Sequence, residues 1–170
     1  GKKENKFGVS EKKFLELVEY VKNSNFLKLK CMSVHIGSQI LDHKPYEKML
    51  NVLKKVIHKT NFNFEYIDLG GGMGIDYEKN NKKLNLKKYE LSIKKFLKKY
   101  NSKIIFEPGR IIVANSGYLI SKVIYIKEGF KKDFIIMDAA MNDLMRPALY
   151  NAKHHIIPTK KDGRKSKKIY

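Results

Sequence analysis

Helical and extended sequence patterns alternate along residues 10–106, and this alternation limits the folds open to the chain. Residues spaced as on one face of a helix are apolar over about 10–23, 44–58 and 86–100. Apolar runs typical of buried strands cover 27–34, 64–69 and 103–106. Strands that alternate with helices form parallel sheets with right-handed crossovers. The pattern predicts an α/β fold, and spacing alone does not separate a barrel from an open doubly wound sheet.

The pattern changes after Gly117. Residues 119–126 and 134–137 have strand-like sequences, joined by a Lys/Gly-rich turn with no helix between them. We therefore expect two domains, one α/β domain over 1–115 and the beginning of a β-rich domain over 116–170. The apolar content of 42% is sufficient for a packed core.

A net charge of +19 at first suggests a nucleic-acid partner. Proteins that read nucleic acids rely on arginine, however. Of the 36 basic residues here, only three are arginines, namely Arg110, Arg146 and Arg164. The lysines are spread along helical faces and tails, as on a solvated surface. We expect no nucleic-acid partner, although a basic nucleic-acid-binding module is one alternative and an anion-attracting face stays open.

The single cysteine, Cys31, cannot form an internal disulfide, which is typical of a reducing compartment. It lies inside an apolar run, so we expect it in the core. No long apolar stretch without charges occurs, and the first ten residues have no signal-peptide pattern. The sequence thus predicts a cytoplasmic protein with no membrane partner.

All three predicted parallel strands end in polar or glycine-rich segments. These are 35–38 (His-Ile-Gly-Ser), 70–74 (Gly-Gly-Gly-Met-Gly) and 107–110 (Glu-Pro-Gly-Arg). In α/β folds, ligands bind at the carboxyl ends of the strands. Because core packing alone does not require this coincidence, the three segments predict one shared ligand site.

The residue types at these strand ends suggest an anionic ligand with a flat ring. A glycine run offers backbone N–H groups to an anion, typically phosphate. It fits neither the dinucleotide nor the P-loop pattern, and a plain tight turn is the alternative. His35 could stack on a ring or transfer protons, and Ser38 could donate to phosphate. Glu107 and Arg110 could instead form a structural ion pair.

Arg146 and Tyr150 stand four residues apart, so one helical turn would direct both side chains the same way. A guanidinium and a phenol together suit a substrate carboxylate. The alternative is an ion pair of Arg146 with Asp138 or Asp143. Adjacent histidines at 154–155 are a poor metal signal because their side chains diverge, and we expect no metal site.

Four segments together resemble the diaminopimelate decarboxylase family of pyridoxal-phosphate enzymes. They are 35–40 (HIGSQI), 68–75 (DLGGGMGI), 107–110 (EPGR) and 141–150 (MNDLMRPALY), and Lys6-Phe7-Gly8 also fits. The first three are shared with ornithine and arginine decarboxylases, whereas the fourth is closest to the diaminopimelate branch. The resemblance implies the C-terminal part of a TIM-like (β/α)8 barrel of the alanine-racemase type, followed by the start of a β-rich domain.

The resemblance also implies a reaction and residue roles. The reaction is decarboxylation of meso-2,6-diaminopimelate to L-lysine by a homodimer that uses pyridoxal 5'-phosphate. His35 would lie against the pyridine ring and Glu107 would hold its nitrogen protonated, so both would be catalytic. The other cofactor-binding residues would be Ser38, Gly70, Gly71, Gly72, Pro108, Gly109 and Arg110. The substrate carboxylates would bind Arg110, Arg146 and Tyr150.

Two alternatives of related chemistry stay open. One is another basic amino-acid or polyamine-pathway decarboxylase, of the ornithine, arginine or carboxynorspermidine type. The other is a non-catalytic relative that binds pyridoxal phosphate. The family's cofactor-bearing lysine would precede Gly1 and its catalytic cysteine would follow Tyr170, so we expect an internal fragment that is inactive alone.

Overall fold

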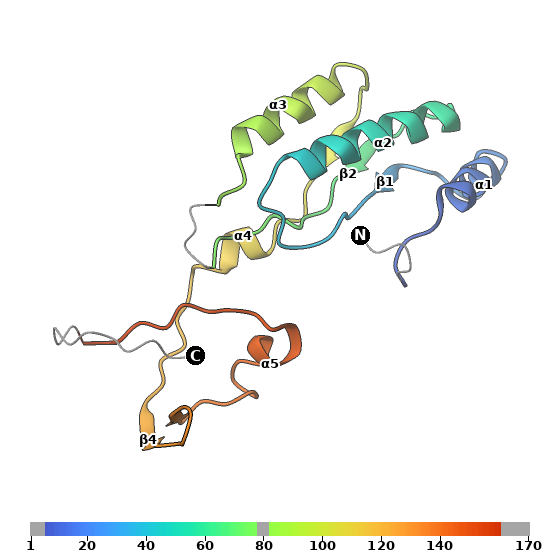
Figure 1. Ribbon diagram of the computed structural model, residues 1–170. Helices are drawn as coiled ribbons and strands as arrows, with labels where there is room; N and C mark the ends of the chain where they lie inside the picture. The colour runs from blue at the N-terminus through green and yellow to red at the C-terminus, as the bar shows by residue number, and fades with distance from the viewer. Residues whose placement is uncertain (1–5, 78–81, 161–170) are drawn as a thin grey trace. The chain divides into compact units, whose positions relative to one another are not determined.

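The computed structural model describes residues 6–77 and 82–160, which form two units (Figure 1). One unit comprises 6–76 and 82–117, and the other comprises Tyr77 and 118–160. Within these ranges, no helix combines the length and the apolar character needed to cross a membrane.

The first unit contains a three-stranded parallel sheet in the order β1-β2-β3. The strands are β1 (Cys31–Ser33), β2 (Tyr66–Asp68) and β3 (Lys103–Ile105). Met32 pairs with Ile67, and Ile67 pairs with Ile104. The predicted alternation and parallel sheet are confirmed, with strands shorter than the apolar runs indicated.

Three amphipathic helices, one before each strand, lie at positions close to those predicted. They are α1 (Glu11–Lys22), α2 (Lys44–Thr60) and α3 (Leu86–Leu97), and a short α4 (Arg110–Val113) follows β3. Ser10 caps the start of α1, because its Oγ accepts a hydrogen bond from the Lys13 N–H at 3.3 Å. Asn85 caps α3 in the same way, accepting from the Lys88 N–H at 2.9 Å.

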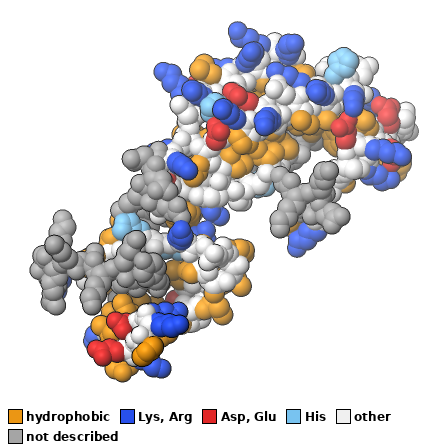
Figure 2. Space-filling view, viewed as in Figure 1, with side chains coloured by type: hydrophobic (Ala, Val, Ile, Leu, Met, Phe, Trp, Pro, Cys, Tyr) orange, Lys and Arg blue, Asp and Glu red, His pale blue; other side chains and the backbone are white. Residues whose placement is uncertain are grey.

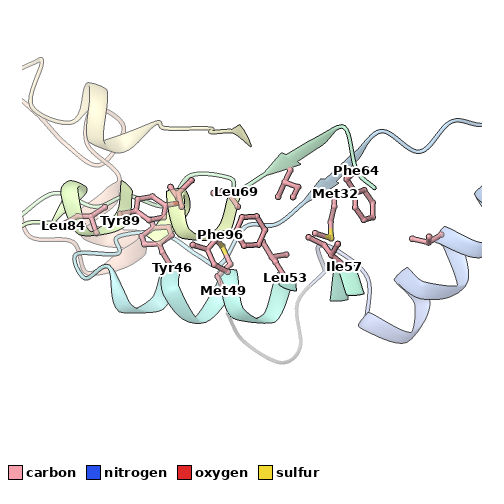
Figure 3. Packing of buried hydrophobic residues seen from close by; sticks show 14 residues of the cluster. Met32, Tyr46, Met49, Leu53, Ile57, Phe64, Leu69, Leu84, Tyr89 and Phe96 are labelled. Carbon is pink, nitrogen blue, oxygen red and sulfur yellow. The ribbon is translucent and has the colours of Figure 1, made fainter. Parts of the chain in front are cut away.

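The core of the first unit lies between the sheet and the helices, and α2 packs against both α1 and α3 (Figures 1 and 3). Its buried residues are Val18, Met32, Tyr46, Met49, Leu50, Leu53, Ile57, Phe64, Ile67, Leu69, Leu84, Tyr89, Ile93 and Phe96. The prediction of Cys31 in the core is wrong, since the residue is exposed. Successive strand residues face opposite sides of a sheet, so burial of Met32 directs Cys31 away from this core.

Two tyrosine rings pack against each other within this core. The ring centroids of Tyr46 and Tyr89 are 4.3 Å apart (Figure 3). The Tyr46 hydroxyl donates to the Gly71 carbonyl at 3.1 Å, and burial raises the pKa of Tyr46 to about 12. The Tyr89 hydroxyl is buried without a hydrogen-bond partner among the described residues. Helix α2 thus supports the glycine run directly through Tyr46.

Removing each of these two hydroxyls should have a different effect on the free energy of unfolding. We expect Tyr46→Phe to lower the free energy of unfolding by about 1 kcal/mol or more, because it leaves the buried Gly71 carbonyl unpaired. Tyr89→Phe removes a hydroxyl that makes no such bond, so we expect a change within about 0.5 kcal/mol or a small gain. Urea unfolding of both variants measures the difference. Equal losses would contradict a supporting role for Tyr46.

Basic side chains on the one face that Figure 2 shows are not gathered at one place. On the face seen in Figure 2, Lys and Arg side chains are scattered, with acidic side chains between them. Lys94 pairs with Glu90 within α3, and Lys59 of α2 reaches Glu11 of α1 at 2.6 Å. This distribution agrees with the interpretation of the lysines as a solvated surface.

The second unit contains an antiparallel pair and one short helix. The strands are β4 (Val123–Lys127) and β5 (Phe134–Met137), with Lys127 opposite Phe134, and the helix is α5 (Arg146–Tyr150). Asp138 follows β5 and accepts from Ser121 Oγ and the Lys122 N–H, both at 2.8 Å. These hydrogen bonds lower the pKa of Asp138, that from Lys122 contributing most. The domain limits 1–115 and 116–170 stay a prediction.

Candidate functional site

The site begins at Asp68, the last residue of β2. Its carboxylate accepts from the Gly70 N–H at 2.8 Å through Oδ1 and from Ser33 Oγ at 3.0 Å through Oδ2. Asp68 is only 8% exposed. A buried carboxylate with both oxygens hydrogen-bonded is well satisfied, so Asp68 fixes the start of the glycine run to the end of β1.

The glycine run lies in direct contact with the backbone of both neighbouring strand-end loops. A Cβ on Gly71 would come within 2.1 Å of the Glu107 carbonyl oxygen, and one on Gly72 within 2.0 Å of the Gly37 carbonyl oxygen. Gly72 also has a φ of 83°, in the left-handed region. Only glycine permits such an approach, so at these two points the backbones of the loops lie in direct contact.

His35 lies beside this run, two residues after β1. The Gly71 N–H donates to its Nδ1 at 3.4 Å, so Nδ1 acts as an acceptor and the neutral ring carries its proton on Nε2. The residue is exposed. An imidazole in this position can lie against a flat ligand ring while its Nδ1 accepts from the loop.

The loop after β1 also pairs with the end of the glycine run. The Ile40 N–H donates to the Gly72 carbonyl at 2.9 Å, and the Gly74 N–H donates to the Ile40 carbonyl at 3.0 Å. Gln39 Nε2 donates to the Ile75 carbonyl at 2.5 Å, and Gln39 Oε1 accepts from Arg110 Nη1 at 3.0 Å. Gln39 therefore links all three strand-end loops.

Glu107 and Arg110 occupy different surroundings at the end of β3. The Glu107 N–H donates to the Gly70 carbonyl at 2.8 Å, and the residue is exposed to solvent. Arg110 is half-buried at the start of α4 and contacts Gln39. Pro108 and Gly109 between them are exposed, and a Cβ on Gly109 would meet no atom within 4 Å. Backbone pairing at Glu107 thus leaves its carboxylate available to a ligand.

The structure brings together the predicted site residues of the first unit. His35 and Ser38 come from the loop after β1, the glycines from the loop after β2, and residues 107–110 from the loop after β3. Sequence reasoning assigned no role to Asp68, Gln39 or Tyr46. The adjacency of Asp68 and Gln39 to the motifs was a usable signal, whereas nothing in the sequence marked Tyr46.

Arg146 and Tyr150 belong to the second unit, on the predicted helical turn α5. Arg146 Nη1 donates to His154 Nε2 at 2.9 Å, and its guanidinium carbon lies 5.0 Å from the centre of the Tyr77 ring. Burial, and then the nearby guanidinium, lowers the pKa of His154. The neutral imidazole accepts from Arg146, so it holds the side chain without neutralising its charge.

Asp138 and Asp143, the expected alternative partners of Arg146, accept other hydrogen bonds. Asp138 accepts from Ser121 and Lys122, and Asp143 accepts from the Ala140 N–H at 2.9 Å. Tyr150 is exposed at the end of α5. The role of Arg146 and Tyr150 as carboxylate ligands stays a prediction.

The first-unit residues fit a ligand that combines a phosphate with a heteroaromatic ring. Because Gly71 and Gly72 have no side chains, their backbone lies exposed to the neighbouring loops at the site. His35 and Glu107 come from the two flanking strand ends. The Gly70 N–H already donates to Asp68. The Gly71 N–H in turn donates to His35 Nδ1. The role of glycines 70–72 in binding an anion stays a prediction.

Known proteins match this chain closely. A model of the family described as pyridoxal-dependent decarboxylase, pyridoxal binding domain, matches residues 1–114. Diaminopimelate decarboxylase of Helicobacter pylori is 44% identical over 160 residues, which are 92% of this chain and 39% of that protein. The enzyme of that name from Aquifex aeolicus is 41% identical over 169 residues, 97% of this chain and 40% of that protein.

The fold is also similar to that of a solved structure. The crystal structure of diaminopimelate decarboxylase from Helicobacter pylori complexed with L-lysine has a TM-score of 0.83 and 42% identity, over 93% of this chain and 41% of that one. The chain thus spans about two-fifths of the length of its relatives. The predicted fold class and pyridoxal-phosphate cofactor are confirmed. Since the pyridoxal-binding model covers residues 1–114, the chain belongs to the family of pyridoxal-dependent decarboxylases.

Proposed function

We propose that this chain forms part of a diaminopimelate decarboxylase, a carboxy-lyase that converts meso-2,6-diaminopimelate to L-lysine. The observation that carries the proposal is the glycine run of 70–74, whose backbone contacts the loops of His35 and Glu107. This arrangement gives one ligand an anion site, an imidazole face and a carboxylate. The similarity to the diaminopimelate decarboxylases of two bacteria supports this choice of substrate.

The residues divide the work of the reaction. When bound, pyridoxal phosphate supplies an electron sink for the electron pair that remains on the substrate Cα as CO₂ leaves. Gly70, Gly71, Gly72 and Gly109 would surround the phosphate with backbone, assisted by the Ser38 hydroxyl. His35 would lie against one face of the pyridine ring. Glu107 keeps a proton on the ring nitrogen, because an anionic partner favours the charged form of that nitrogen.

The substrate carries a carboxylate at each end. The resemblance to the family implies that Arg110, Arg146 and Tyr150 would bind the carboxylates of the substrate. Arginine suits this task because its planar fork matches a carboxylate with two parallel hydrogen bonds. Residues 1–115 act as part of the barrel that holds the cofactor, and 116–170 as the beginning of the β domain.

A substrate assay of the complete enzyme tests the proposal. We expect release of CO₂ and formation of L-lysine from meso-2,6-diaminopimelate, with little or no turnover of ornithine or arginine. Turnover of ornithine or arginine without activity on diaminopimelate would overturn the assignment. Bound pyridoxal phosphate without turnover of any of them would favour a non-catalytic relative.

We also propose that the protein works as a homodimer in the cytoplasm. The dimer is implied by the resemblance to the family, and an unpaired, exposed Cys31 is compatible with a reducing compartment. Light scattering coupled to size-exclusion chromatography of the complete enzyme would measure the assembly. A monomer that retains full specific activity would contradict the dimer.

A further inference from the structure

Gln39 occupies an unusual backbone position at the junction of the three strand-end loops. Its φ of 62° is in the left-handed region, which residues other than glycine seldom adopt. The Ile40 N–H and carbonyl, immediately after it, pair with Gly72 and Gly74. A Cβ on Gly74 would lie 2.8 Å from the Gln39 carbonyl carbon and 3.0 Å from Oε1. The surrounding backbone therefore holds Gln39 in one conformation.

The side chain of Gln39 makes contacts that define the orientation of its amide. Nε2 donates to the Ile75 carbonyl at 2.5 Å, and Oε1 faces the Ile75 N–H at 3.4 Å and Arg110 Nη1 at 3.0 Å. Reversing the amide would place its NH₂ group against two donors and its oxygen against a carbonyl. The Oε1 atom therefore presents an acceptor to the guanidinium.

We propose that Gln39 is a positioning residue that orients the Arg110 guanidinium toward the carboxylate of the substrate. An amide oxygen is a neutral acceptor, so this hydrogen bond holds the guanidinium in place without neutralising its charge. A carboxylate at the same position would pair with Arg110 and compete with the substrate. The identity of the ligand rests on the proposed function, whereas the orientation of Arg110 does not.

Two substitutions separate the hydrogen bond from the charge. Gln39→Met keeps the length of the side chain and removes both polar atoms. Gln39→Glu keeps the shape, adds a negative charge beside Arg110 and loses the donor to the Ile75 carbonyl. Asn63→Asp is the matched control for the charge. Asn63 is an exposed amide before the amino end of β2, whereas the site lies at the carboxyl ends of the strands.

The first measurement does not depend on any substrate. Phenylglyoxal modifies accessible arginines, and peptide mass spectrometry of the complete enzyme gives a rate for each one. We expect Gln39→Met to raise the rate at Arg110 several-fold and to leave Arg146, in the other unit, unchanged. An unchanged rate at Arg110 in folded protein would overturn the proposal. If Gln39→Met does not fold, a changed rate at Arg110 in Gln39→Glu supports it and an unchanged rate overturns it.

The second measurement is the kinetics with meso-2,6-diaminopimelate. We expect Gln39→Glu to raise KM about tenfold or more with a smaller change in kcat, since weakened carboxylate binding acts mainly on KM. Asn63→Asp should leave both constants unchanged. Lower thermal stability with unchanged KM and kcat per folded molecule would make Gln39 a loop residue only. If the wild type does not use diaminopimelate while Arg110 responds to Gln39→Met, the proposed function fails and the orientation of Arg110 by Gln39 stands.

Discussion

Gly71→Ala should abolish pyridoxal-phosphate binding and lower the free energy of unfolding by about 3 kcal/mol or more. The added Cβ would lie 2.1 Å from the Glu107 carbonyl oxygen, and that oxygen is backbone, which cannot turn aside like a flexible side chain. Relief requires the loop after β2 to separate from the loop after β3. Such a movement would break the hydrogen bond from the Glu107 N–H to the Gly70 carbonyl and displace the Glu107 carboxylate.

Gly71 gives a sharper test than its neighbours because its φ is not in the left-handed region, so alanine there adds a clash without backbone strain. Gly70 and Gly72 have φ values of 64° and 83°, so alanine there would add backbone strain to any clash. Gly117→Ala is the matched control, since its Cβ would meet no atom within 4 Å. Urea unfolding and equilibrium titration with pyridoxal phosphate measure both variants. Unchanged cofactor affinity in Gly71→Ala would show that the close contact of the loops is unimportant for the site.

The helices and the positions of the strands along the chain could be predicted because local periodicity marks them. Strand length could not, since a strand extends only as far as its neighbour offers hydrogen bonds. Residues 27–34 read as one strand, yet β1 covers only Cys31–Ser33, the three residues that pair with β2. The error at Cys31 has a related cause. An apolar run does not reveal which of its alternate residues faces the helices.

The candidate site was predictable where the residue type itself is the signal. Glycine runs, a strand-end histidine and an Arg-Tyr spacing can be recognised in one dimension. Tyr46 acts through a contact with a residue 25 positions further along the chain, so the sequence contains no local mark of its role. Gln39 lies within the segment 35–40, but its contact with Arg110 spans 71 positions and is visible only in the fold. Asp68 is intermediate: it adjoins the glycine run, but only the fold shows that its two oxygens join β1 to that run.

Glu107→Gln should lower kcat by about 100-fold or more while the protein stays folded. The amide has almost the same shape as the carboxylate but cannot hold a proton on the pyridine nitrogen. The backbone of Glu107 is fixed by its N–H bond to the Gly70 carbonyl, which the substitution leaves intact. Because the side chain belongs to an exposed residue, we expect the free energy of unfolding to change by no more than about 0.5 kcal/mol.

A second exposed carboxylate provides the matched control for this substitution. Glu65 stands just before β2, at the opposite end of the sheet, and pairs with Lys30 at 3.1 Å. Glu65→Gln removes the same charge without touching the site, so kcat should be unchanged. Steady-state kinetics per cofactor-loaded molecule, with thermal unfolding of each variant, compares the two. If Glu107→Gln loses stability but keeps its turnover per folded molecule, Glu107 serves the fold as a partner of Arg110, and the proton on the ring nitrogen requires another source.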